Sequence, residues 1–115
     1  VTTTKSGLKY IVHQRGSSAE APNGIDRVVV NYRGTLKGGH EFDSSYSRGV
    51  PAEFGVSQVI SGWTEGLQLM HEGDIFEFII PSNLAYGSRG INGVIPPNSE
   101  LNFKVHLISI KRGTL

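Results

Sequence analysis

Residues 59–70 carry the one strong helix pattern in this chain, and that pattern limits the folds that the chain can form. Apolar side chains recur there at steps of three and four residues, which places them on one helical face. These side chains are Ile60, Trp63, Leu67 and Met70. We expect Ser61 to cap the start of the helix and Gly73 to stop it. Glu65 then lies near the positive end of the helix dipole.

The other periodic segments alternate apolar and polar side chains at every second residue, as half-buried strands do. They are residues 8–14, 27–36, 74–81 and 101–110. The pair Gly38-Gly39 predicts a hairpin turn before a return strand that begins at 41–43. Phe54 and Val56 mark a further short strand. A short amphipathic helix among strands buries its apolar face against a curved sheet, which predicts an α+β fold.

Three segments between the strands lack this alternation. Residues 44–51 indicate a bulge or an excursion at a sheet edge. Residues 82–86 leave room for no more than one helical turn, and residues 87–98 form a long loop of a kind that often carries function. The length of the chain predicts one domain, residues 1–115.

Composition and spacing exclude several classes of function. A net charge of +1 gives no reason to expect a nucleic-acid partner, and no apolar run reaches the roughly 20 residues of a membrane span. The chain has no cysteine, and it lacks nucleophile-elbow and phosphate-loop motifs. Its histidines are scattered without metal-ligand spacing, so we expect them on the surface and predict no metal and no cofactor. They are His13, His40, His71 and His106.

Aromatic residues are the remaining candidates for a site, because they come from several different elements. They are Tyr32, Phe42, Phe54, Trp63, Tyr86 and Phe103. Composition alone favours a core built from aromatic side chains over a pocket. Asp43 is harder to explain as a core residue, since a buried carboxylate needs partners. Tyr32 and Arg48 are the candidate partners.

Five short blocks, in this order and at this spacing, resemble the FK506-binding protein family of peptidyl-prolyl isomerases. The blocks are Val30–Gly34, Glu41–Ser45, Val59–Trp63, Leu84–Gly87 and Ile95–Pro97. The resemblance covers about residues 6–111. Further segments are most similar to the macrophage infectivity potentiator (Mip) branch of the family. These segments are Phe54–Ile60, Leu67–Met70 and His106–Lys111.

The resemblance implies a strongly curved antiparallel β-sheet wrapped around one short α-helix, with a ligand pocket that has Trp63 as its floor. The implied walls are Tyr32, Phe42, Phe54, Val59, Ile60, Tyr86, Ile95 and Phe103. Asp43 is implied at the rim, held by Tyr32 and Arg48, while the Ile60 N–H and the Tyr86 hydroxyl bind ligand carbonyls. The implied catalytic residues are Tyr32, Asp43, Trp63, Tyr86 and Phe103. The chain departs from a frequent family pattern at Ala52, where a second aromatic residue is common.

The implied activity is rotation about X-Pro bonds in protein folding, which needs no nucleophile, base or metal. The implied partners are proline-containing or unfolded polypeptides and the macrolides FK506 and rapamycin, bound by a monomeric domain. One alternative stays open, an interaction or chaperone module with little catalysis. A carrier of small apolar ligands would need a closed cavity, which an open sheet edge does not suggest. The Mip-like resemblance suggests a role in virulence. It also favours a secreted, periplasmic or cell-surface location, with a cytoplasmic one still possible.

Overall fold

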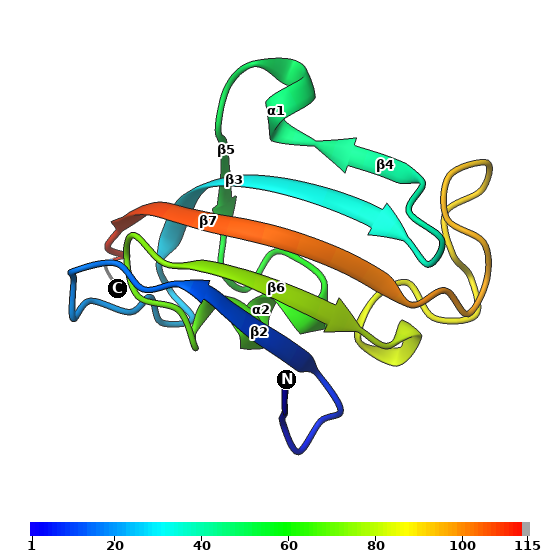
Figure 1. Cartoon of the computed structure of the whole chain (residues 1–115), viewed down its shortest axis with the longest axis horizontal. Coiled ribbons are helices and arrows are strands. Elements are labelled where there is room, and N and C mark those ends of the chain that lie inside the picture. Colours follow the sequence, from blue (N-terminus) through cyan, green and yellow to red (C-terminus); the bar gives the residue numbers. More distant parts are fainter. Residues whose placement is uncertain (114–115) are drawn as a thin grey trace.

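A curved antiparallel sheet wraps around a short helix in the computed structural model, which describes residues 1–113 (Figure 1). The predicted domain, residues 1–115, extends two residues beyond this range. The strands are β1 (Thr2–Thr3), β2 (Lys9–Gln14), β3 (Arg27–Leu36), β4 (Glu41–Ser44), β5 (Ala52–Gly55), β6 (Ile75–Ile80) and β7 (Leu101–Lys111). The helical elements are α1 (Ser45–Arg48), α2 (Ser61–Leu67) and a 3₁₀ turn, η1 (Ser82–Leu84). Within residues 1–113, the predicted α+β fold is confirmed.

The sheet has the strand order β1-β2-β6-β7-β3-β4, and β5 also pairs with β3. Figure 1 shows the C-terminal strand β7 lying between β6 and β3. The pairing of β3 with β7 runs from Arg27 opposite Lys111 to Leu36 opposite Leu101, with one irregularity at Val29–Val30. The predicted alternation is confirmed, because the apolar residues of both strands enter the core. These are Val28, Val30, Tyr32, Leu101, Phe103, Val105 and Leu107.

Helix α2 lies very close to β6 because two glycines face that strand. A Cβ atom at Gly62 would lie 2.6 Å from Cγ2 of Ile80, and one at Gly66 would lie 2.6 Å from Cε1 of Phe78. Real Cβ atoms do not approach other atoms this closely, so both positions require glycine. Trp63 and Leu67 extend from the same helix into the core, with 4% and 0% of their surface exposed.

The predicted ends of this helix were wrong. Ile60 is its N-cap residue and makes no side-chain capping bond, whereas Ser61 is already the first helical residue. The helix stops at Leu67, well before Gly73, whose positive φ of 95° serves a later turn. Met70 is fully buried, as its spacing predicted, but it lies beyond the helix. The helical spacing of apolar residues therefore continues in the sequence beyond the point where the helix ends.

Residues 45–48 of the segment 44–51 form one helical turn, α1, so the chain leaves the sheet edge between β4 and β5 as the predicted excursion and not as a bulge. Ser44 Oγ accepts hydrogen bonds from the backbone N–H groups of Tyr46 and Ser47, which caps α1. Gly49 ends the turn in the left-handed conformation, with φ of 77°. The predicted single turn after β6 is confirmed by η1, whereas β1 was not predicted.

A buried carboxylate before β6 anchors two connections to each other. Asp74 is 0% exposed, and its side chain accepts hydrogen bonds from the backbone N–H groups of Gly16 at 2.7 Å and His71 at 2.9 Å. Arg15 Nη1 donates to the same carboxylate at 3.2 Å. We call this cluster the Asp74 anchor. It ties the segment after β2 to the turn before β6.

Within residues 1–113, no helix has both the length and the apolar character that a membrane crossing requires.

Candidate active site

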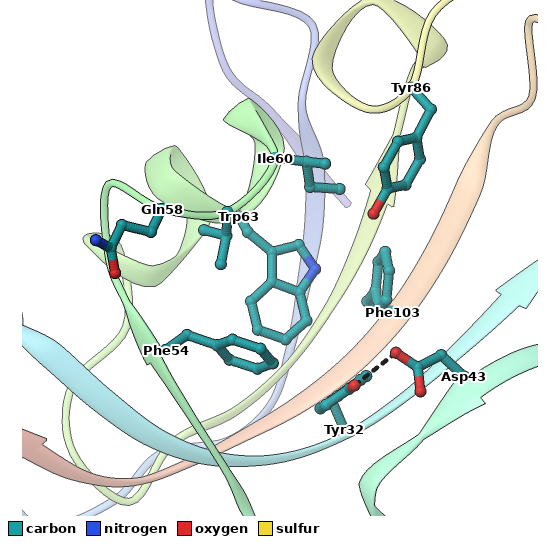
Figure 2. Close-up of a pocket in the computed structure, with 9 residues that line it drawn as sticks. Tyr32, Asp43, Phe54, Gln58, Ile60, Trp63, Tyr86 and Phe103 are labelled. Carbon is teal, nitrogen blue, oxygen red and sulfur yellow. Dashed lines mark hydrogen bonds between the residues drawn. The ribbon is translucent and has the colours of Figure 1, made fainter. Parts of the chain in front are cut away.

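A cavity of about 450 Å³ opens between α2 and the concave face of the sheet. Its lining comes from β3, β4, β5, the segment before α2, α2 itself, the segment after η1, and β7 (Figure 2). The lining residues are Tyr32, Asp43, Phe54, Gln58, Val59, Ile60, Trp63, Tyr86 and Phe103. One small cavity thus collects side chains that are up to 71 positions apart, from Tyr32 to Phe103.

Four aromatic rings form the inner part of the cavity, with the Trp63 indole at the centre (Figure 2). The Tyr32 and Phe103 rings meet the indole at 90° and 89°, each with its centroid 5.2 Å away. The Phe54 ring meets it at 81° and 5.5 Å. Edge-to-face contacts of this kind are the favoured geometry for aromatic pairs. The rings therefore hold one another in place, and the apolar surface is formed before any ligand enters.

A charged triad closes one edge of the cavity. Tyr32 Oη donates a hydrogen bond to Asp43 Oδ2 at 2.6 Å and accepts one from Arg48 Nη2 at 2.8 Å. Arg48 Nη1 donates to Asp43 Oδ1 at 2.6 Å. This triad satisfies the expectation that Asp43 has Tyr32 and Arg48 as partners.

The triad also sets the charges at the rim. Burial raises the pKa of Asp43, but the hydrogen bonds from Tyr32 and Arg48 outweigh it, so the pKa lies below its usual value. Burial, followed by the bond to Asp43, raises the pKa of Tyr32. At neutral pH the rim therefore presents a carboxylate and a guanidinium, with a neutral phenol between them.

Tyr86 faces the cavity from the opposite side. Figure 2 shows its hydroxyl directed into the space above Phe103. Burial, and next the charge of Asp43, raise the pKa of Tyr86, so its hydroxyl keeps its proton at neutral pH. The side chain is 36% exposed, which leaves it at the border between cavity and solvent. A neutral phenol in this place can donate a hydrogen bond to a ligand carbonyl.

Ile60 lies at the junction between the pocket wall and α2. Its carbonyl accepts the first helical hydrogen bonds, from the N–H groups of Trp63 at 2.9 Å and Thr64 at 3.1 Å. The side chain of Thr64 also bonds the carbonyl of Val56 at 2.7 Å. The segment before the helix is therefore fixed at both ends.

Three residues expected at the pocket do not line it. The Phe42 ring packs behind Phe103, at 5.4 Å and 83°, and Arg48 acts through the rim triad. Ile95 is a buried residue of the 87–98 loop and lines a second hollow of about 430 Å³. Gln58 lines the pocket and was not expected there. Its only sequence signal is its place directly before Val59, which was expected at the site.

The histidines lie outside the cavity, since none is among its lining residues. Residues 1–113 contain no group of three or more histidine or acidic side chains arranged to hold a metal ion. His13 and His40 are exposed, whereas His71 and His106 are partly buried, so the surface prediction holds fully for the first two only.

The chain is similar to known proteins over most of its length. The family model described as FKBP-type peptidyl-prolyl cis-trans isomerase matches residues 18–108. The chain belongs to this family. It is 49% identical over 112 residues to outer membrane protein MIP of Legionella longbeachae, a match that covers 97% of this chain and 48% of the relative. The predicted Mip-like character of this FKBP chain is thus confirmed.

Solved structures support the FKBP fold. The crystal structure of FkpA from Escherichia coli superposes with a TM-score of 0.93 at 48% identity, over 98% of this chain and 52% of that one. The crystal structure of AtFKBP13 gives 0.86 at 37% identity, over 96% and 97% of the two chains. This chain spans less than half the length of the first curated relatives that it matches. The matched segment makes up 40–48% of each of these relatives.

Proposed function

We propose that this FKBP domain, taken as residues 1–115, is a peptidyl-prolyl cis-trans isomerase that acts on X-Pro bonds in polypeptides. The observation that carries the proposal is the box of aromatic rings around Trp63, which is apolar, mutually braced and open at one side. Membership of the FKBP family supports the same activity.

The physical basis is the loss of amide resonance during rotation. The barrier to rotation about a peptide bond is roughly 18–20 kcal/mol, and X-Pro bonds interconvert only in tens of seconds or more. A twisted amide separates less charge than a planar one, so an apolar pocket favours the twisted form. Each 1.36 kcal/mol of such preference gives about a tenfold increase in rate.

The pocket residues take three proposed roles. Aromatic side chains grip the proline ring, polar groups orient the peptide, and neighbouring side chains hold these two sets in place. The gripping residues are Tyr32, Phe54, Trp63 and Phe103, with Val59 and Ile60 as the adjoining wall. The orienting groups are the Tyr86 hydroxyl, the Ile60 N–H and the Asp43 carboxylate. The holding residues are Phe42 behind Phe103 and Arg48 beside Asp43.

We also propose that FK506 and rapamycin bind in the aromatic pocket, because each carries a proline-like ring. The domain is proposed to act as a monomer on unfolded or proline-containing chains. The name of the Legionella longbeachae relative refers to the outer membrane. We infer a location outside the cytoplasm for this protein as well, and a role in infection like the one that the name macrophage infectivity potentiator describes.

A protease-coupled assay on a short Ala-Leu-Pro-Phe type peptide tests the proposal directly. The folded domain should speed cis-to-trans conversion in proportion to its concentration, and saturating FK506 should abolish the gain. A rate equal to the uncatalysed one at micromolar domain would contradict the proposal.

The alternative of a binding module has one observation in its favour. Apolar side chains beside the second hollow are exposed, with Ile91 at 37% and Val94 at 45%. Such a surface suits an extended chain. A domain that suppresses aggregation of an unfolded protein, yet leaves X-Pro rotation at its uncatalysed rate, would favour this alternative.

A further inference from the structure

The indole nitrogen of Trp63 is a buried hydrogen-bond donor without an acceptor. Among the side chains of residues 1–113, it is the one buried nitrogen or oxygen atom that lacks a partner. The residue is only 4% exposed. Buried tryptophan N–H groups usually find an acceptor, and leaving one without a partner costs free energy. This exception therefore calls for an explanation in terms of the site.

The orphan donor lies in the candidate active site. Figure 2 shows the nitrogen on the edge of the indole nearest to Tyr86 and Phe103, on the same side as the Tyr86 hydroxyl. The Phe103 and Tyr32 rings, both 5.2 Å from the indole and nearly perpendicular to it, offer only weak N–H···π contacts. An atom with a free lone pair is a better acceptor than a ring face.

A bound X-Pro bond supplies such an atom only while it rotates. In the planar amide, the prolyl nitrogen shares its lone pair with the carbonyl and accepts no hydrogen bond. At the twisted transition state, resonance is lost and the lone pair becomes localised on nitrogen. A donor placed beside the proline ring then gains a partner that the ground state lacks. Interactions made only in the transition state raise kcat.

We propose that the Trp63 Nε1–H donates a hydrogen bond to the prolyl nitrogen of the substrate as the X-Pro bond twists. No proton is transferred, so the indole keeps its hydrogen throughout. The proposal rests on the proposed isomerase function and adds a polar role for Trp63 to its role as an apolar floor. It also explains why the indole N–H has no hydrogen-bond partner in the free protein.

Replacing the N–H by sulfur tests the proposal with little change in shape. Trp63 is the only tryptophan in the chain. Chemical synthesis with 3-benzothienylalanine in place of tryptophan therefore alters this position alone. The matched control is the same synthetic chain with tryptophan, refolded in the same way. Circular dichroism and the melting temperature establish that both chains fold. If the 3-benzothienylalanine chain does not refold, a chain with 2-naphthylalanine at this position replaces it. That side chain also has no hydrogen-bond donor.

The donor-free chain should show a kcat about tenfold lower, the factor that corresponds to 1.36 kcal/mol, with KM nearly unchanged. Equal kcat values for the two chains would overturn the proposal. A lower melting temperature of the analogue would then reflect only the loss of a structural N–H···π contact. A rise in KM that accounts for the whole loss would also overturn it, since the acceptor would then be a ground-state atom. If the tryptophan chain itself fails to accelerate rotation, the isomerase proposal fails instead.

The indole signal in a ¹H–¹⁵N NMR spectrum gives an independent measurement on the unaltered chain. With a saturating X-Pro peptide, the proton should stay at the upfield position of an N–H that faces aromatic rings. A downfield shift on binding would show a ground-state acceptor and overturn the assignment to the prolyl nitrogen.

Discussion

The Asp74 anchor and the Trp63 pocket both bury polar groups, but among the described residues only the pocket leaves a buried side-chain group, the indole N–H, without a partner. The carboxylate of Asp74 accepts bonds from two backbone N–H groups and one guanidinium. The indole N–H of Trp63 has no acceptor among the described residues. A buried polar group with all its bonds made adds stability, whereas one without a partner lowers it. The comparison separates a region built to hold the chain together from a region prepared for a ligand.

Removing an aromatic wall should give the largest effect. Phe103→Ala deletes a ring that packs against three other aromatic side chains, so it should cost about 3–5 kcal/mol of unfolding free energy. The folded variant should also lose most of its isomerase activity. Urea unfolding and the protease-coupled assay measure the two losses.

Phe76→Ala is the matched control for this variant. Phe76 is fully buried but stacks on Tyr10, outside the pocket. It should lose similar stability while its folded fraction keeps a normal kcat/KM. Equal losses of activity in the two variants would show that the pocket has no special role.

Breaking the anchor should affect stability alone. In Asp74→Asn the amide can no longer serve all three donors, so we expect a loss of about 2–4 kcal/mol of unfolding free energy. Under conditions where the variant is folded, its kcat/KM should equal that of the parent chain. A matching loss of activity would mean that the two regions are coupled.

A macrolide should stabilise the pocket without involving the anchor. FK506 at about 100 times its Kd should add about 2.7 kcal/mol to the unfolding free energy, because it binds only the folded state. The parent chain and Asp74→Asn should gain equally, while Phe103→Ala gains less. Thermal unfolding with and without FK506 measures this, and an unshifted melting temperature in the parent chain would exclude macrolide binding there.

Tyr86→Phe should have a smaller effect than loss of a wall. The variant removes one hydroxyl from a partly exposed side chain, and one hydrogen bond contributes about 0.5–1.5 kcal/mol. We therefore expect a loss of kcat/KM of roughly tenfold or less, and less than for Trp63→Ala or Phe103→Ala. If Tyr86→Phe is the most damaging variant, the apolar pocket is not the main source of the rate.

A change of pH near neutrality should have the smallest effect. The pKa of Asp43 is lowered below 3.8, while the pKa values of Tyr32 and Tyr86 are raised above 10.0. None of the three titrates between about pH 5 and 9, so kcat/KM for an uncharged peptide should be flat there. A limb near pH 6.5 that one histidine variant removes would contradict a proton-free mechanism.

The same pKa shifts predict in which direction the stability of the fold changes outside this pH range. The Asp43 carboxylate stabilises the fold above its unfolded pKa, and this contribution is lost as pH falls through the lowered folded value. The Tyr32 phenol stabilises the fold in its protonated form, and this contribution is lost as pH rises above 10.0. Urea unfolding at several pH values should show both losses.

Sequence patterns predicted the periodic elements well, because alternation and helical spacing follow directly from which faces are buried. They failed at helix boundaries, where capping and turns decide the path of the backbone. Ser44 caps α1 in a segment that looked irregular, and Met70 continues a helical spacing after the chain has already turned. The strand order is equally absent from any local pattern, since it depends on which distant segments meet. Of the aromatic residues expected at the pocket, Phe42 does not line it, and the lining residue Gln58 was not expected.

The central position of β7 has a consequence for how the chain acquires its shape. Its residues pair with β3 residues that lie 65 (Leu36 with Leu101) to 84 (Arg27 with Lys111) positions earlier, and Phe103 of the pocket belongs to β7. Folds dominated by such distant pairings form in milliseconds to seconds rather than microseconds. During synthesis the aromatic box remains incomplete until residues 101–111 have left the ribosome. A domain proposed to speed the folding of other chains thus completes its own active site only when β7 is available to pair with β3.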